Sequence, residues 1–167
     1  LVLTGCTGRG RGGVEGTPAP APTWGEQDLA APGRLTLISW LDLTEPPRAG
    51  GSRSQAVYLR SMAKQFTDAG LQLVVAHRPA PGTPALSSEQ LSTAAGDLGL
   101  AGVTVRSDPA GVLADRYGVS GAPSTALLAP DGSILVTWTA LALPQDLAAA
   151  VTAAVHATPR QTAVPVD

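Results

Sequence analysis

The stretch that decides the fold is GVSGAPSTALLAPDGSILVTW, residues 118–138. It contains two apolar runs rich in β-branched residues, 124–129 and 133–138, with Asp131-Gly132 between them. Two runs of strand length joined by a short turn that contains Asp-Gly are typical of a β-hairpin. We therefore predict that these runs form neighbouring antiparallel strands.

Pro123 stands at the entrance to the first of these strands. A proline is tolerated there because the first position of a strand need not donate a ladder hydrogen bond. A Gly-Ala-Pro approach is also compatible with a cis peptide bond, which is essentially a proline feature. We expect Ala122–Pro123 to be cis and to face the loop of residues 44–48.

Upstream of the hairpin, residues 35–41 form a nearly continuous apolar run, as expected for a central strand covered on both faces. Apolar residues at helical spacing over 54–66 predict a helix, and Gly70 stands where a helix C-terminal glycine belongs. A second buried strand is predicted over 71–77. A βαβ unit of this kind requires parallel strands and a right-handed crossover.

A second helix is predicted to begin after Ser87, since Gln90 three residues later completes a capping box, and to end near Gly99. A short strand is expected over 103–105. The predicted order of elements so far is strand, helix, strand, helix, strand.

A third helix is expected to be capped by Asp108, with Pro109 at its first position and Gly118 just past its end. It would deliver the chain to the hairpin. A last helix, rich in Ala and Leu, is predicted from Pro144 to about His156.

This order, together with Tyr117-Gly118-Val119, Pro123 and Asp131-Gly132, resembles the thioredoxin-like superfamily, in particular its TlpA-like and redoxin branch. The resemblance covers residues 33–156. It implies an α/β three-layer sandwich with a central mixed sheet, helices on both faces, and the inserted helix and strand of TlpA-like members.

The chain departs from this family at the expected active site. Members typically carry Trp-Cys-Pro-Pro-Cys, whereas here Glu45 and Arg48 stand where the two cysteines would be, around the retained Pro46-Pro47. Thiol exchange needs a thiolate, which neither side chain can supply. We therefore treat residues 44–48 as a degenerate active-site loop, whose members are Thr44, Glu45, Pro46, Pro47 and Arg48. Gly50-Gly51 delays the helix relative to the family pattern, so the register of this alignment stays open.

Cys6 is the one cysteine, which excludes an internal disulfide, a CxxC pair and a multi-thiolate metal site. Residues 1–6, LVLTGC, resemble the end of a bacterial lipoprotein signal segment with its lipobox, and we expect lipid on Cys6. Residues 7–32 are Gly-rich and then Pro-rich, as in a tether that holds a domain off a membrane. Residues 157–167 are expected to be a disordered tail.

The rest of the sequence offers few side chains that could form a binding or catalytic site. A net charge of -2 gives no field that would attract nucleic acid. His77 ends a strand and His156 ends a helix, and we expect both to be structural, with no metal and no cofactor. Glu45 and Arg48 are spaced to pair across the first turn of a helix, and we favour a solvated surface pair over a functional one.

The sequence thus predicts a lipid-anchored, redox-inactive thioredoxin-like domain of the cell envelope, on the outer side of the cytoplasmic membrane or in a periplasm. The resemblance implies a groove at Ala122 and Pro123 that pairs with an extended polypeptide or envelope partner, as in β-augmentation. Two alternatives stay open: a thiol-disulfide oxidoreductase with an unrecognised mechanism, and a structural subunit of an envelope complex.

Overall fold

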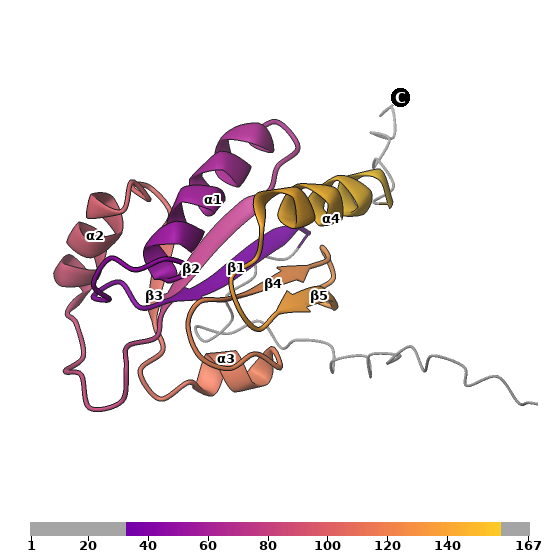
Figure 1. The fold of residues 1–167 in the computed structure, drawn as a ribbon. Helices are drawn as coiled ribbons and strands as arrows, with labels where there is room; N and C mark the ends of the chain where they lie inside the picture. The colour runs from indigo at the N-terminus through magenta and orange to yellow at the C-terminus, as the bar shows by residue number, and fades with distance from the viewer. Residues whose placement is uncertain (1–32, 158–167) are drawn as a thin grey trace, which may run out of the picture.

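The computed structural model describes residues 33–157 (Figure 1). The expectations for Cys6, for the tether of residues 7–32 and for residues 158–167 of the tail lie outside this part of the chain. Along the chain the elements are β1 (Thr36–Leu41), α1 (Ser52–Gln65), β2 (Gln72–His77), α2 (Ser88–Asp97), β3 (Thr104–Ser107), α3 (Val112–Arg116), β4 (Ser124–Leu128), β5 (Ile134–Trp138) and α4 (Pro144–Ala157).

The strands form one five-stranded sheet in the order β3-β2-β1-β4-β5. β1 runs parallel to β2, and β2 to β3, while β4 is antiparallel to both β1 and β5. Every residue of β1 and of β4 is buried, which explains why both read as nearly continuous apolar runs. The sheet is mixed, as predicted, with β2 and β3 on one side of β1 and the hairpin of β4 and β5 on the other.

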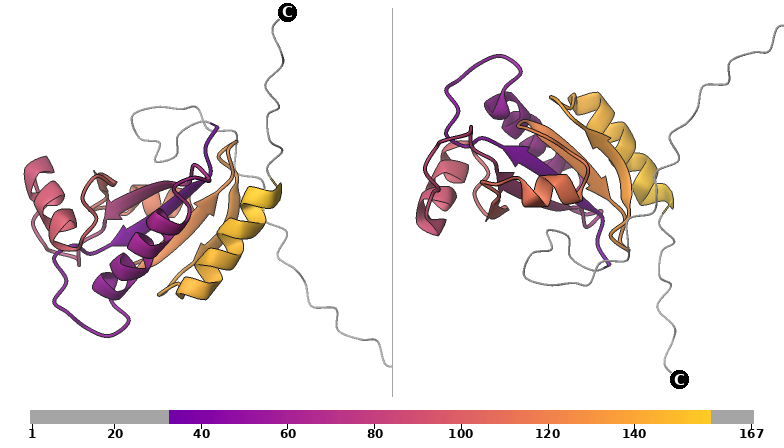
Figure 2. Two further views of the ribbon diagram at one scale, coloured as in Figure 1. Left: turned by 90° about the horizontal axis from the view of Figure 1, so that it is seen from above. Right: turned by 90° about the horizontal axis from the view of Figure 1, so that it is seen from below.

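Helices cover both faces of the sheet. α1 and α4 lie side by side on one face, α3 lies on the other, and α2 lies beyond the β3 edge (Figures 1 and 2). The larger hydrophobic core joins the sheet to α1, α2 and α4, and includes Leu37, Leu59 and Val151. The smaller core, around Trp40 and Tyr117, lies under α3. This is the three-layer arrangement that the order of elements predicted.

The hairpin forms as predicted. Its turn is closed by hydrogen bonds from Ala129 N to Ser133 O and from Gly132 N to Ala129 O, both 2.9 Å. The Asp131 carboxylate accepts from the backbone N–H and the hydroxyl of Ser133. Gly132 has a φ of +84°, a conformation that favours glycine.

The start of α3 differs from the prediction. Pro109 is not its first residue: the helix begins at Val112, after Gly111 at a φ of +74°. Asp108 nevertheless caps it from upstream, accepting from Leu113 N at 3.1 Å and Ala114 N at 2.9 Å. The capping residue was therefore correct and the helix start was wrong, because an extra turn lies between cap and helix.

The other helices lie close to their predicted bounds. The Ser87–Gln90 capping box of α2 is present in both directions. α1 begins at Ser52, two residues before the predicted start. None of the helices between residues 33 and 157 has the length and hydropathy needed to cross a membrane.

Candidate functional site

A hollow of about 480 Å³ lies where four loops meet at the end of the sheet that follows β1 and β2. We call it the groove. One wall is the loop after β1, with Asp42, Glu45 and Arg48; a second is the loop of residues 78–81 after β2. The remainder is formed by Pro109 and Ala110 before α3 and by Gly121 and Ala122 before β4. The structure therefore brings the degenerate active-site loop and the Ala122–Pro123 segment together, although they are far apart in sequence.

Asp42 holds two of these loops in place. Its Oδ1 accepts from the backbone N–H and the hydroxyl of Thr44, at 2.9 and 2.6 Å. Its Oδ2 accepts from Ala80 N in the facing loop, at 3.2 Å. Both carboxylate oxygens thus accept hydrogen bonds from the loops after β1 and β2.

Glu45 caps α1 from the preceding loop. Gly51, at the N-cap, has no side chain that could accept a hydrogen bond, and the Glu45 carboxylate accepts from Ser52 N at 2.7 Å instead. A negative charge is favourable at the N-terminus of a helix. Burial raises the pKa of Glu45, but hydrogen bonds from Ser52 and Arg48 outweigh it, so the net pKa lies below the ordinary 4.5.

The Glu45–Arg48 pair forms at the surface and is in contact with solvent, as predicted. Arg48 Nε donates to Glu45 Oε1, with 57% of the Arg48 side chain exposed and 13% of the Glu45 side chain. Both residues precede the helix, so the prediction of a pair across its first turn was wrong. The space beside Gly51 explains the geometry: a Cβ there would lie 2.9 Å from Glu45 Oε2 and 2.8 Å from Arg48 Cγ.

The Ala122–Pro123 peptide bond is cis, in agreement with the expectation. Pro123 is buried, while Ala122 is partly exposed and lines the groove. Among the described residues, neither the N–H nor the C=O of Ala122 makes a hydrogen bond. Ala122 therefore presents a free backbone donor and acceptor, with Pro123 between it and β4.

The other predicted loop residues lie outside the groove. Thr44, Pro46 and Pro47 are exposed and do not line it. Of the described residues that do line it, none is Cys, Ser, Thr, His or Lys. The groove thus offers guanidinium groups and free backbone for binding, and its two carboxylates already accept hydrogen bonds from the surrounding loops.

No protein-family model and no curated protein matches the chain. Solved structures do match it. A candidate DsbE thiol:disulfide interchange protein from Chlorobium tepidum aligns with a TM-score of 0.58 at 20% identity, over 74% of this chain and 81% of that one. A candidate thioredoxin from Neisseria meningitidis aligns with a TM-score of 0.61 at 21% identity, over 76% of this chain and 78% of that one. A secreted disulfide oxidoreductase from Mycobacterium tuberculosis aligns with a TM-score of 0.55 at 18% identity, over 73% of this chain and 83% of that one.

The chain has a thioredoxin-like fold. The sequence carries a single cysteine, Cys6, outside the described residues, so residues 33–157 of this thioredoxin-like domain contain no thiol.

A buried connection beneath the groove could not be read from the sequence. Trp40 Nε1 donates to Asp108 Oδ2 at 3.0 Å, and the Trp40 ring packs on Tyr117 with centroids 5.7 Å apart. Trp40 is fully buried and Asp108 is 3% exposed. The residues lie 68 positions apart, so no local pattern predicts the bond. It ties the strand before the active-site loop to the helix before the hairpin.

The two histidines do not form a site. His77 is fully buried, and its Nδ1 accepts from Leu43 N at 3.2 Å, which supports the start of the loop after β1. Burial lowers the pKa of His77, so the ring is neutral at neutral pH. His156 is exposed in the last turn of α4. In the described part of the chain, no three His, Cys, Asp or Glu side chains gather as a metal-binding group.

Proposed function

We propose that this thioredoxin-like domain binds an extended polypeptide along the groove and does not catalyse thiol exchange. The observation that carries the proposal is the unbonded backbone of Ala122 in a groove wall. An extended segment that lies beside Ala122 would satisfy both groups as a short β-augmentation, without any thiol.

The stiffness of the groove supports a binding role. Pro79, Pro81 and Pro109 line its walls, and proline restricts the backbone to a narrow range. Asp42 and Glu45 fix the loop after β1 through backbone hydrogen bonds. A site that is rigid before binding loses less conformational entropy when its partner arrives.

Two matched substitutions test the proposal. Ala110 is exposed in the groove, and Ala69 is exposed in a separate hollow of about 640 Å³ at the opposite end of the sheet. The probe is reduced, carboxamidomethylated α-lactalbumin, an unfolded polypeptide without free thiols. We expect the domain to bind it, Ala110→Trp to abolish binding by filling the groove, and Ala69→Trp to leave binding unchanged. No binding, or binding that Ala110→Trp leaves intact, would overturn the proposal.

The proposal also predicts that the domain is redox-inactive. A thiolate must attack in disulfide exchange, and residues 33–157 contain no Cys. We expect a full chain with Cys6→Ser to show no insulin reduction or disulfide isomerisation above background. Turnover by this variant would instead support the oxidoreductase alternative.

We further propose that Cys6 carries lipid and anchors the domain in the cell envelope. The support is the sequence Leu3-Thr4-Gly5-Cys6 and the Gly- and Pro-rich segment that follows it. Mass spectrometry of natively expressed protein should find an acylated peptide that begins at Cys6. An unmodified peptide of residues 1–9 recovered from membranes would contradict this proposal.

A further inference from the structure

Arg78 is the cation in the groove that lacks a counter-charge. It follows β2 directly, and its backbone N–H donates to Leu41 O at 2.9 Å. Its Nη1 is buried and has no hydrogen-bond partner among the described residues. With the other residues between 33 and 157, Arg78 forms no ion pair. A buried N–H of a charged group without a partner is costly, and such groups are normally paired.

Packing holds the Arg78 guanidinium in place. It lies against Gly111, where a Cβ would be 1.5 Å from Arg78 Nη1 and 2.4 Å from Cζ. Gly111 therefore has no side chain for two reasons, this contact and its φ of +74°. Because Nη1 is buried against Gly111, the hydrogen-bonding capacity that a ligand in the groove could use is that of the other guanidinium nitrogens.

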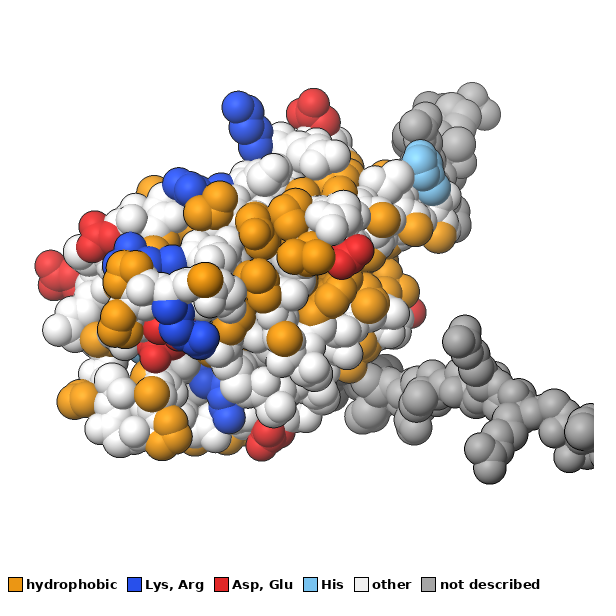
Figure 3. Space-filling model, viewed as in Figure 1, with side chains coloured by type: hydrophobic (Ala, Val, Ile, Leu, Met, Phe, Trp, Pro, Cys, Tyr) orange, Lys and Arg blue, Asp and Glu red, His pale blue; other side chains and the backbone are white. Residues whose placement is uncertain are grey.

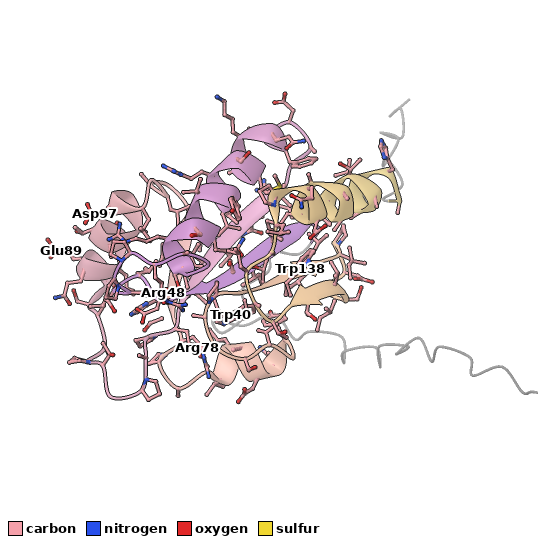
Figure 4. All side chains as sticks on the ribbon, viewed as in Figure 1. Trp40, Arg48, Arg78, Glu89, Asp97 and Trp138 are labelled. Atoms are coloured by element: carbon pink, nitrogen blue, oxygen red, sulfur yellow. The ribbon has the colours of Figure 1, made fainter. Side chains whose placement is uncertain are left out.

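The carboxylates that share the groove do not use this capacity. Asp42 is occupied by Thr44 and Ala80, and Glu45 by Ser52 and Arg48. Figure 4 shows Arg48 and Arg78 on neighbouring loops at the same end of the molecule, and in Figure 3 basic side chains are exposed along this side. Arg78 therefore brings to the groove a positive charge that no described carboxylate neutralises, which favours an anionic ligand.

We propose that Arg78 binds a carboxylate carried by the polypeptide in the groove, and so selects acidic segments. This inference rests on the proposed function, because the same groove is the binding site. The Arg78 guanidinium would donate to the carboxylate while the ligand backbone pairs with Ala122. Arg–carboxylate hydrogen bonds are shorter and stronger than neutral ones, and they add geometric specificity.

Two blocked heptapeptides test the proposal by calorimetry: acetyl-AVTETVA-amide and its uncharged partner acetyl-AVTQTVA-amide. We expect the wild-type domain to bind the Glu peptide about tenfold more tightly than the Gln peptide at low salt. In Arg78→Gln this preference should disappear while the Gln peptide still binds. The matched control is Arg34→Gln, which removes the same charge from an exposed residue at the opposite end of the sheet and should keep the preference.

The outcomes separate this inference from the proposed function. Equal binding of both heptapeptides to the wild type, with both lost in Ala110→Trp, overturns the selection of acidic side chains by Arg78 and leaves the proposed groove intact. A preference that survives in Arg78→Gln overturns this selection by Arg78 as well. Binding that Ala110→Trp does not change, or no binding of either peptide, overturns both.

A second pair of peptides identifies the source of the carboxylate. Acetyl-AVTQ with a free C-terminus is compared with the same peptide amidated. If Arg78 recognises a chain terminus, the free acid should bind more tightly in the wild type and not in Arg78→Gln. If it recognises an acidic side chain, this pair should bind alike while the Glu and Gln heptapeptides differ.

Discussion

Two carboxylates in this molecule have the same local task and different surroundings. Glu45 accepts from the first backbone N–H of α1, and Asp108 accepts from two in the first turn of α3. Each lies several residues upstream of its helix and reaches back across a loop. Each replaces a cap that glycine, at Gly51 and Gly111, cannot provide.

The difference is what else each carboxylate contacts. Asp108 is 3% exposed and also accepts from the buried Trp40 indole. Glu45 is in the groove wall, and its second partner is the mostly exposed Arg48. The capping carboxylate of Asp108 is thus part of the hydrophobic core, whereas that of Glu45 is part of a surface site. Substitutions should therefore affect stability strongly at Asp108 and weakly at Glu45.

The largest effect is expected for Asp108→Ala. It removes three hydrogen bonds and leaves the Trp40 N–H buried without a partner, which should lower the free energy of unfolding by about 3 kcal/mol. Urea unfolding measures this change. Asp97→Asn, at an exposed position near the end of α2 (Figure 4), is the control and should change stability by less than about 0.5 kcal/mol. A similar loss in the free energy of unfolding of both variants would contradict the special role of Asp108.

Glu45→Gln should cost less, about 1 kcal/mol, because the amide can still accept from Ser52 but carries no charge. The control is Glu89→Gln, in the first turn of α2 at an exposed position (Figure 4). We expect that control to change stability by no more than a few tenths of a kcal/mol. A loss at Glu45 as large as at Asp108 would show that the groove wall is part of the core.

The effect of Glu45 should depend on pH with a defined sign. Its folded-state pKa lies below the ordinary 4.5, so its charge stabilises the fold above that pH. As the pH falls below 4.5 and through the folded-state pKa, the carboxylate is protonated and this contribution is lost. The stability difference between wild type and Glu45→Gln should therefore be constant near neutral pH and shrink in acid. A difference that grows in acid would contradict the assignment.

The smallest effect is expected for Arg48→Ala. The side chain is 57% exposed, and an ion pair of this kind contributes no more than about 0.5 kcal/mol to stability. Urea unfolding of Arg48→Ala at low and high salt checks this. A loss above 1 kcal/mol, on the order of a well-placed cap, would mean that Arg48 and not Ser52 positions Glu45.

The contrast between Glu45 and Asp108 also explains which features of the structure could be predicted from the sequence. The hairpin, the βαβ unit and the Ser87–Gln90 cap follow local patterns, and the structure contains them. The Trp40–Asp108 bond depends on side chains that only the fold brings together. The spacing of Glu45 and Arg48 predicted their pair, but it could not show that the Glu45 carboxylate also reaches Ser52 N across Gly50-Gly51. The groove itself arises from loops after β1 and β2 and before α3 and β4, so its Arg78 could not be found by motif.

The central claim is that an extended polypeptide binds beside Ala122, and an amide-resolved NMR titration tests it most directly. The ¹⁵N-labelled domain is titrated with reduced, carboxamidomethylated α-lactalbumin. We predict that the amide of Ala122 shifts or broadens first, together with amides of residues 42–48 and 78–81 around the groove. Unchanged spectra, or changes centred on the opposite hollow around Gly70, would contradict the account.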